Sequence, residues 1–149
     1  MRGYFGIGIY AVKTGANVGT LWRSAYQLGA AFIFTIGKRY PRQASDTVKA
    51  WRHVPLFEYQ TFDDFMLHRP NDCPLIGIEM GGRTLGEYHH QERSVYLLGA
   101  EDGGLPKDIQ SSCQTILSIP SVRTESYNVA VAGSIVMYDR IYGGQRAKD

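Results

Sequence analysis

An amide and a guanidinium lie six residues apart near the N-terminus, in the segment Asn17-Val18-Gly19-Thr20-Leu21-Trp22-Arg23. Arginine stays charged at any physiological pH, and its planar fork matches phosphate oxygens. An amide both donates and accepts hydrogen bonds, so Asn17 can orient a neighbouring polar group. The pair could bind an anionic, hydroxyl-bearing ligand. Taken alone, the segment is more typical of a helix cap followed by a surface arginine.

A second segment, Leu98-Gly99-Ala100-Glu101-Asp102-Gly103-Gly104-Leu105-Pro106, follows the apolar run 95–98. Open α/β sheets bind ligands outside the carboxyl ends of their strands. Glycines there let the backbone approach a ligand closely and adopt positive φ angles. The spacing matches neither the dinucleotide fingerprint nor a Walker motif. An ordinary tight turn, with Asp102 as a turn acid, is the alternative.

The third segment leads from an apolar run, through Ile119 and Pro120, to Ser126-Tyr127-Asn128-Val129-Ala130. Proline ends the strand, and a polar loop then precedes a helix. Ser126 or Asn128 could simply cap that helix. A cap at a strand-end crevice would also direct backbone N–H groups toward a ligand.

In this order, the three segments resemble the SpoU/TrmH branch of the SPOUT superfamily, whose members transfer a methyl group from S-adenosylmethionine to a ribose 2′-hydroxyl of RNA. The resemblance implies the catalytic residues Arg23, Asn17, Glu101, Ser126 and Asn128. It implies cofactor contacts from Ile78, Gly99, Glu101, Gly104, Ile119, Ser126 and Asn128. Leucine is usual between the serine and the asparagine of the third segment, whereas this chain has Tyr127, which could reshape the pocket.

The family mechanism makes Arg23 the base that deprotonates the ribose hydroxyl. Because the pKa of arginine exceeds about 12, we expect Arg23 instead to hold a phosphate and stabilise the developing alkoxide. The proton would then leave to a phosphate oxygen or to water. Asn17 would orient Arg23 or the ribose, and Glu101 would fix the loop of the second segment.

The resemblance also implies a fold, an assembly and a substrate. The fold is α/β, a mainly parallel sheet flanked by helices with a C-terminal trefoil knot. Family members are homodimers that associate through the knot region and the last helix. The chain resembles the minimal single-domain type, which favours tRNA over rRNA. An rRNA ribose methyltransferase, a base methyltransferase and a non-catalytic RNA-binding relative are the alternatives.

The apolar pattern independently favours alternating strands and helices. It predicts strands over 6–12, 31–36, 74–79, 95–99 and 115–119, with a further candidate over 56–59. It predicts helices over 19–28, 46–51, 62–67, 107–112 and from Asn128 to about Tyr142. In the first helix Arg23 lies opposite the apolar stripe, and Gly29 ends the helix. The last helix has small and apolar residues on nearly every side, which indicates contact with the sheet and with a partner subunit, the alternative being a helix buried within its own chain.

Composition sets outer limits on these expectations. With 149 residues and 44% hydrophobic residues, we expect one domain, 1–149. The sequence has neither a signal-peptide pattern nor an apolar stretch long enough for a membrane span, so we expect a cytoplasmic protein. The net charge of +2 is too small to indicate nucleic-acid binding by itself, and Arg39, Arg42, Lys49 and Arg52 form one candidate basic patch.

The cysteines and histidines do not point to chemistry. We expect the two cysteines, Cys73 and Cys113, to be reduced thiols and mostly buried. The four histidines lack a metal-ligand spacing, so no metal is expected. The pair His89-His90 is typical of a surface loop.

Overall fold

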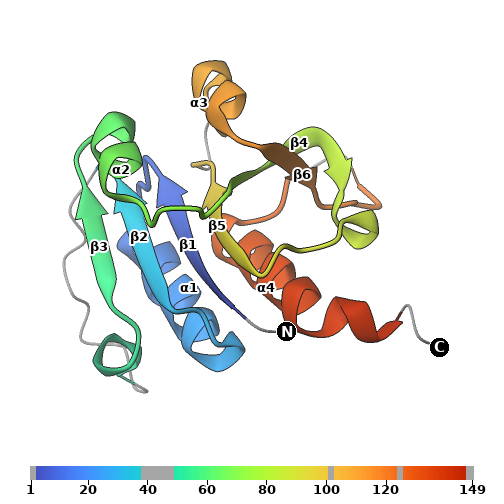
Figure 1. The fold of residues 1–149 in the computed structure, drawn as a ribbon, viewed down its shortest axis with the longest axis horizontal. Coiled ribbons are helices and arrows are strands. Elements are labelled where there is room, and N and C mark those ends of the chain that lie inside the picture. The colour runs from blue at the N-terminus through green and yellow to red at the C-terminus, as the bar shows by residue number, and fades with distance from the viewer. Residues whose placement is uncertain (1–2, 38–48, 101–102, 124–125, 147–149) are drawn as a thin grey trace.

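The computed structural model describes residues 3–37, 49–100, 103–123 and 126–146. Their strands form a six-stranded sheet in the order β3-β2-β1-β5-β4-β6, and every neighbouring pair is parallel (Figure 1). The predicted parallel α/β sheet is therefore confirmed. The strands are β1 (Tyr4–Tyr10), β2 (Phe32–Ile36), β3 (Leu56–Tyr59), β4 (Leu75–Thr84), β5 (Arg93–Leu98) and β6 (Thr115–Ser118).

The strand β4 runs five residues beyond its predicted end. Its pairing with β6 shifts register between Ile78 and Arg83, so the strand bends where its first half ends. The apolar half, 75–78, is buried, whereas the second half is mostly exposed and polar. The sequence pattern predicted only the buried half because exposed residues at a bulge carry little apolar signal.

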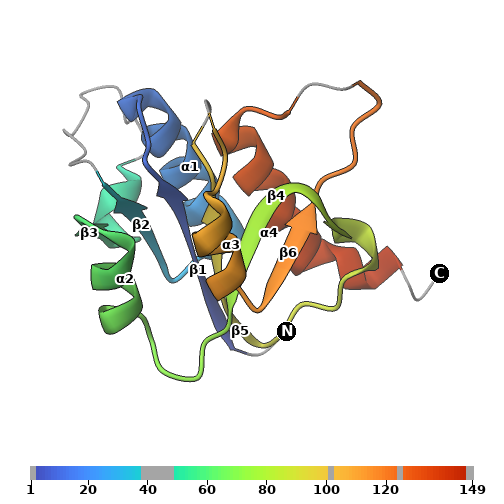
Figure 2. The ribbon, with the colours of Figure 1, turned by 90° about the horizontal axis from the view of Figure 1, so that it is seen from above.

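Helices cover both faces of the sheet and make three layers (Figures 1 and 2). They are α1 (Gly15–Leu28), α2 (Phe62–His68), α3 (Lys107–Ser112) and α4 (Val129–Arg146), with two 3₁₀ turns, η1 (Ala50–Arg52) and η2 (Leu85–Glu87). One core cluster joins α1 and α4 to the sheet, and a second joins α2 and α3 to the opposite face. Burial on both faces explains why the central strands are apolar without alternation.

The first helix begins four residues earlier than predicted, at Gly15, with Thr14 as its N-cap. Asn17 therefore lies within the first turn and does not cap the helix. Gly29 ends the helix with a left-handed φ of 84°, as predicted. Arg23 is exposed, opposite a buried stripe of Val18, Leu21, Trp22 and Ala25, which confirms the predicted orientation.

Several other boundaries differ. The first strand, predicted over 6–12, covers Tyr4–Tyr10 and ends before Ala11, whose φ is 54°. The helix predicted over 46–51 is the short turn η1, and residues 46–48 lie outside the described ranges. The last helix begins after Asn128 and continues to Arg146. The expected trefoil knot concerns how the chain threads through itself, which the order of strands does not decide, so the knot stays a prediction. Within the described ranges, no helix is both long and apolar enough to cross a membrane.

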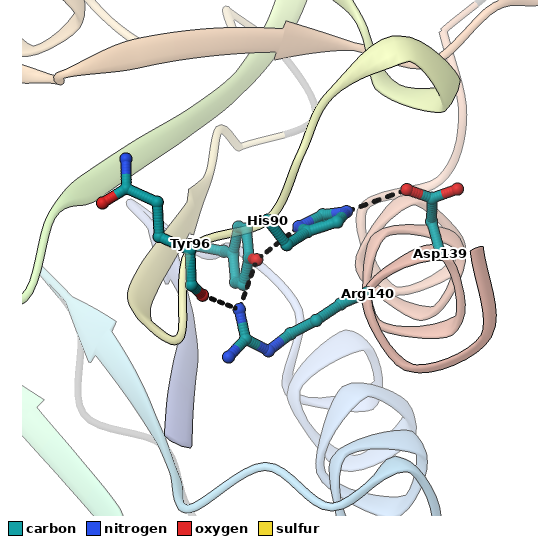
Figure 3. Close-up of polar contacts among 5 residues, drawn as sticks. His90, Tyr96, Asp139 and Arg140 are labelled. Carbon is teal, nitrogen blue, oxygen red and sulfur yellow. Dashed lines mark hydrogen bonds and ion pairs between the residues drawn. The ribbon is translucent and has the colours of Figure 1, made fainter. Parts of the chain in front are cut away.

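The expectation of a surface loop at His89-His90 is wrong for His90. Its side chain is only 5% exposed, and it lies between Tyr96 of β5 and Asp139 of α4 (Figure 3). One ring nitrogen lies 2.6 Å from the Tyr96 hydroxyl and the other 2.8 Å from the Asp139 carboxylate. Arg140 donates to the Tyr96 hydroxyl at 3.1 Å and to the carbonyl of Gln91 at 2.7 Å.

This polar cluster attaches the second half of α4 to the segment before β5. Burial lowers the pKa of His90, while the Asp139 carboxylate opposes that shift. Sequence spacing could not reveal the cluster because His90 and Asp139 are 49 residues apart.

Candidate active site

A cavity of about 550 Å³ opens where the buried half of β4 ends and at the carboxyl ends of β5 and β6, next to the start of α4. Its wall comes from three segments, residues 78–81, residues 98–100 with 103–104, and residues between 118 and 132. The three strand ends meet because parallel strands present their carboxyl ends at one edge of the sheet. Ile78, Gly99, Gly104, Ile119 and Ser126, five of the residues implied as cofactor contacts, line this cavity.

Backbone forms the part of the wall that follows β5. The amide of Gly104 donates to the carbonyl of Ala100 at 3.1 Å, and these residues pair as an antiparallel bridge. The turn is so tight that a Cβ on Gly99 would lie 2.5 Å from the carbonyl carbon of Gly104. Glycine at position 99 therefore allows the two arms of the turn to touch. This part of the cavity wall therefore consists mainly of backbone.

Glu79, which the sequence analysis did not single out, holds this turn in place. One carboxylate oxygen accepts from the Leu105 amide at 2.7 Å, and the other accepts from the Met80 amide at 2.9 Å. Glu79 thus joins the end of the buried part of β4 to the turn after β5. It is also the one carboxylate among the described residues that line the cavity. Glu101, expected to fix the same loop, lies outside the described residues.

The first and third segments meet beside the cavity. Asn128 donates through its side-chain amide to the Asn17 oxygen at 3.0 Å. The Asn128 oxygen accepts from the backbone amides of Ala130 at 2.9 Å and Val131 at 3.2 Å, so it caps α4. Asn17 in turn donates to the Thr14 hydroxyl at 2.9 Å. Asn128, rather than Ser126, is therefore the helix cap, and it joins the starts of α1 and α4.

Tyr127, the departure from the family pattern, forms part of the cavity wall. Its hydroxyl donates to the carbonyl of Pro120 at 2.7 Å, which closes the polar loop between β6 and α4. Its ring remains 38% exposed. The tyrosine therefore adds a contact that the usual leucine lacks, and its ring borders the space available to a ligand.

Arg23 does not line the cavity of its own chain. It lies exposed on α1, six residues beyond Asn17, which corresponds to about 9 Å along the helix axis. The guanidinium is therefore available to a large ligand that extends over the outer face of α1. In the candidate basic patch Lys49 and Arg52 are exposed, whereas Arg39 and Arg42 lie outside the described residues.

The thiols are unsuited to nucleophilic chemistry. Burial raises the pKa of Cys113 to about 11 and also raises the pKa of Cys73. A thiol with a raised pKa stays protonated at neutral pH and is a poor nucleophile. Among the described residues, no group of three or more His, Cys, Asp or Glu side chains could hold a metal ion.

The sequence of the chain matches a known protein family and several known proteins. A model of the SpoU rRNA Methylase family matches residues 5–138. The proposed tRNA (cytidine(34)-2′-O)-methyltransferase of Synechocystis sp. is 27% identical over 131 residues, which are 85% of this chain and 82% of that protein. Several mycobacterial tRNA/rRNA methyltransferases, themselves uncharacterised, are 28% identical, and the chain spans only about two fifths of their length.

Solved structures share the fold. A structure concerned with 2-OH methylation of C/U34 on tRNA aligns with a TM-score of 0.84 at 23% identity, covering 97% of this chain and 98% of that one. The SpoU methyltransferase AviRb from Streptomyces viridochromogenes, in complex with AdoMet, aligns with a TM-score of 0.81 at 20% identity. That alignment covers 99% of this chain and 59% of that one.

Proposed function

This chain belongs to the SpoU rRNA methylase family, and we propose that it methylates a ribose 2′-hydroxyl of RNA, with tRNA preferred to rRNA. Family membership makes it an S-adenosylmethionine-dependent RNA methyltransferase. Beyond family membership, we propose the acceptor atom, the type of RNA and the catalytic residues. It rests chiefly on one observation, the Asn17–Asn128 hydrogen bond beside a cavity built from three strand ends.

The cavity suits the methyl donor in size and chemistry. Pockets for small molecules and cofactors typically enclose about 300–1,000 Å³, and this one encloses about 550 Å³. Ile78, Leu98 and Ile119 offer apolar surface to an adenine ring, and the Gly99–Gly104 turn offers peptide groups. The bound donor would supply an electrophilic methyl group on a positively charged sulfur. The Glu79 carboxylate complements that charge.

The chain's own contribution is to position and polarise the acceptor. Methyl transfer forms a bond from the ribose oxygen to carbon as the carbon–sulfur bond breaks, so these atoms must be aligned at roughly 3 Å. The hydrogen bond between Asn17 and Asn128 orients their two side-chain amides beside the cavity. Arg23 binds a phosphate and stabilises negative charge on the ribose oxygen, whose proton passes to a phosphate oxygen or water. Ser126 adds a hydroxyl to the cavity wall.

The exposed face of α4 supports the proposal of a homodimer. Val131, Tyr138 and Tyr142 are 46%, 54% and 43% exposed, and their spacing of seven and four residues places them on one side of the helix. Ile135, between them, packs partly against the core. A continuous apolar stripe of this kind on a helix is typical of a protein–protein interface. A second copy of the chain would cover it.

The direct test is transfer of a labelled methyl group from S-adenosylmethionine to bulk small RNA and, separately, to ribosomal RNA. We expect label in the small-RNA pool. Label confined to ribosomal RNA would favour the rRNA enzyme. Binding of S-adenosylmethionine without label in either pool would favour the non-catalytic RNA-binding relative. Size-exclusion chromatography with light scattering tests the dimer, with Tyr138→Glu as the variant expected to dissociate it.

A further inference from the structure

Two aromatic rings stack on each other on the outer surface of α1. The rings of Tyr26 and His53 lie 4.8 Å apart between centroids, at an interplanar angle of 22°. Tyr26 is 42% exposed, and His53, which follows η1, is also exposed. In Figure 1, η1 lies at the lower end of β3, beside the end of α1. The pair therefore presents stacked aromatic surface to the solvent.

The position of His53 is fixed by buried neighbours. The indole nitrogen of Trp22 donates to the carbonyl of Val54 at 2.8 Å, which fastens the segment after η1 to α1. The amides of His53 and Val54 both donate to the carbonyl of Ala50 at 2.9 Å. Ala50 is 0% exposed and Val54 is 3% exposed. Because buried residues hold the backbone around it, His53 is positioned against Tyr26 before a ligand binds, which lowers the ordering cost of binding.

The charged side chains on the two segments that carry the stacked pair are all positive. Residues 15–28 contain one charged side chain, Arg23, and residues 49–55 contain Lys49, Arg52 and His53 but neither aspartate nor glutamate. The Arg52 guanidinium lies 5.2 Å from the centre of the Trp51 ring. Exposed cations interleaved with aromatic rings are the side chains that single-stranded nucleic acid requires, for its phosphates and for its bases.

From these observations we infer that Tyr26 and His53 form a platform on which a nucleobase of the RNA substrate stacks, outside the methylated nucleotide. The inference rests on the proposed function, since it takes RNA to be the substrate. It adds a base-recognition site to the phosphate contact proposed for Arg23. Sequence-specific proteins bind unpaired RNA bases by stacking them on aromatic or guanidinium planes. An unpaired segment of RNA is therefore the form that this surface recognises.

The platform is placed to act together with Arg23. Tyr26 follows Arg23 by three residues, so the two side chains are neighbours on the helix surface, separated by about 4.5 Å along its axis. Asn17, Arg23 and Tyr26 thus lie in sequence along α1, from the cavity end of the sheet toward η1. Around the helix axis Arg23 and Tyr26 are about 60° apart, whereas Asn17 lies on the side opposite Tyr26. An RNA strand whose phosphate is bound by Arg23 therefore lies beside the stacking platform.

The test separates base stacking from phosphate attraction. The full chain is titrated with a single-stranded oligoadenylate, and with an abasic ribose-phosphate oligomer of the same length, at one salt concentration. Tyr26→Ala should weaken oligoadenylate binding about tenfold, the usual effect of removing one stacking ring, and leave abasic binding unchanged. Tyr26→Phe keeps the ring and should bind like the unmodified chain. Phe57→Ala is the matched control, because Phe57, on β3, is a 46% exposed aromatic residue that contacts Phe32 of β2.

Three outcomes would show that a base does not stack on Tyr26 and His53. The first is an unchanged affinity of Tyr26→Ala for oligoadenylate, and the second is an equal loss of affinity for both oligomers. The third is dissociation of a dimer by Tyr26→Ala, which would mean that this face is a contact between two copies of the chain. Methyl transfer to bulk small RNA is measured in parallel. If the unmodified chain transfers label and Tyr26→Ala keeps its KM for RNA, the platform is wrong and the proposed function stands. If the unmodified chain transfers no label, the proposed function fails, and the oligomer comparison still decides the platform.

Discussion

The side-chain amide of Asn128 donates a 3.0 Å hydrogen bond to the side chain of Asn17, 111 positions earlier in the chain. The same Asn128 caps α4 through its oxygen. One residue therefore stabilises the start of the last helix and orients an amide at the start of the first. The two roles use different atoms, so substitutions can separate them.

The two roles of Asn128 are separated by the substitutions Asn128→Ala and Asn128→Asp. Alanine removes the cap and should lower the free energy of unfolding by about 1 kcal/mol. Aspartate keeps an acceptor for the amides of Ala130 and Val131, so its stability should be close to that of the unmodified chain. Both variants lose the donor to Asn17, and both should lose methyl transfer. Urea denaturation and an initial-rate assay measure the two effects. Full activity in Asn128→Asp would show that the bond to Asn17 is not needed.

The turn after β5 offers a matched pair of glycines. A Cβ at Gly99 would lie 2.5 Å from the Gly104 carbonyl carbon, whereas a Cβ at Gly103 would have nothing within 4 Å. Gly99→Ala must therefore open the turn and should abolish measurable binding of S-adenosylmethionine by calorimetry. Gly103→Ala should bind nearly normally. Equal affinities in the two variants would place the methyl donor away from this turn.

Glu79 gives a prediction about the same turn from the opposite side. Glutamine keeps one acceptor oxygen, so either the Met80 or the Leu105 amide loses its partner in Glu79→Gln. Loss of a hydrogen bond to a charged acceptor should weaken S-adenosylmethionine binding about tenfold. Glu58→Gln, an exposed change on the edge strand β3, is the control. Unchanged affinity in Glu79→Gln would mean that the Gly104–Ala100 bond holds the turn by itself.

The buried His90 should make folding stability depend on pH. Burial lowers its pKa below 6.5, with smaller lowering effects from Arg140 and His89 and an opposing effect from Asp139. Since the unfolded chain then binds more protons than the folded one, stability is full above pH 6.5 and is lost as the pH falls through the folded pKa. Urea unfolding between about pH 8 and pH 5 measures the slope. His90→Gln should reduce the slope, whereas His89→Gln, next to it and exposed, should retain it.

Sequence reasoning located the cavity because strand ends have a local signature. An apolar run followed by glycines or proline marks a place where a buried strand stops, and parallel strands stop at a common edge. The family resemblance implied Gly99, Gly104 and Ile119 as cofactor contacts, the strand-end pattern agreed with it, and all three line the cavity. The orientation of Arg23 also followed from local helical spacing.

Tertiary contacts without local patterns were missed. Glu79 follows an ordinary apolar run. Its role comes from its hydrogen bond with the amide of Leu105, which lies 26 residues later in the chain. The burial of His90 depends on α4 packing over β5, which no short pattern near His90 encodes. Tyr127 was expected to reshape the pocket, but the bond from its hydroxyl to Pro120 was not foreseen. In each case the decisive partner comes from another element.

The ribose 2′-oxygen is the atom that we expect to receive the methyl group. RNA labelled by the chain should be digested to nucleosides and analysed by mass spectrometry, with Arg23→Ala and Arg23→Lys measured in parallel. We predict label on the ribose, as a 2′-O-methyl nucleoside, its loss in Arg23→Ala, and a rate in Arg23→Lys far below that of the unmodified chain, because an ammonium cannot replace the guanidinium fork. Label on a base, or nearly full activity in Arg23→Lys, would contradict the account.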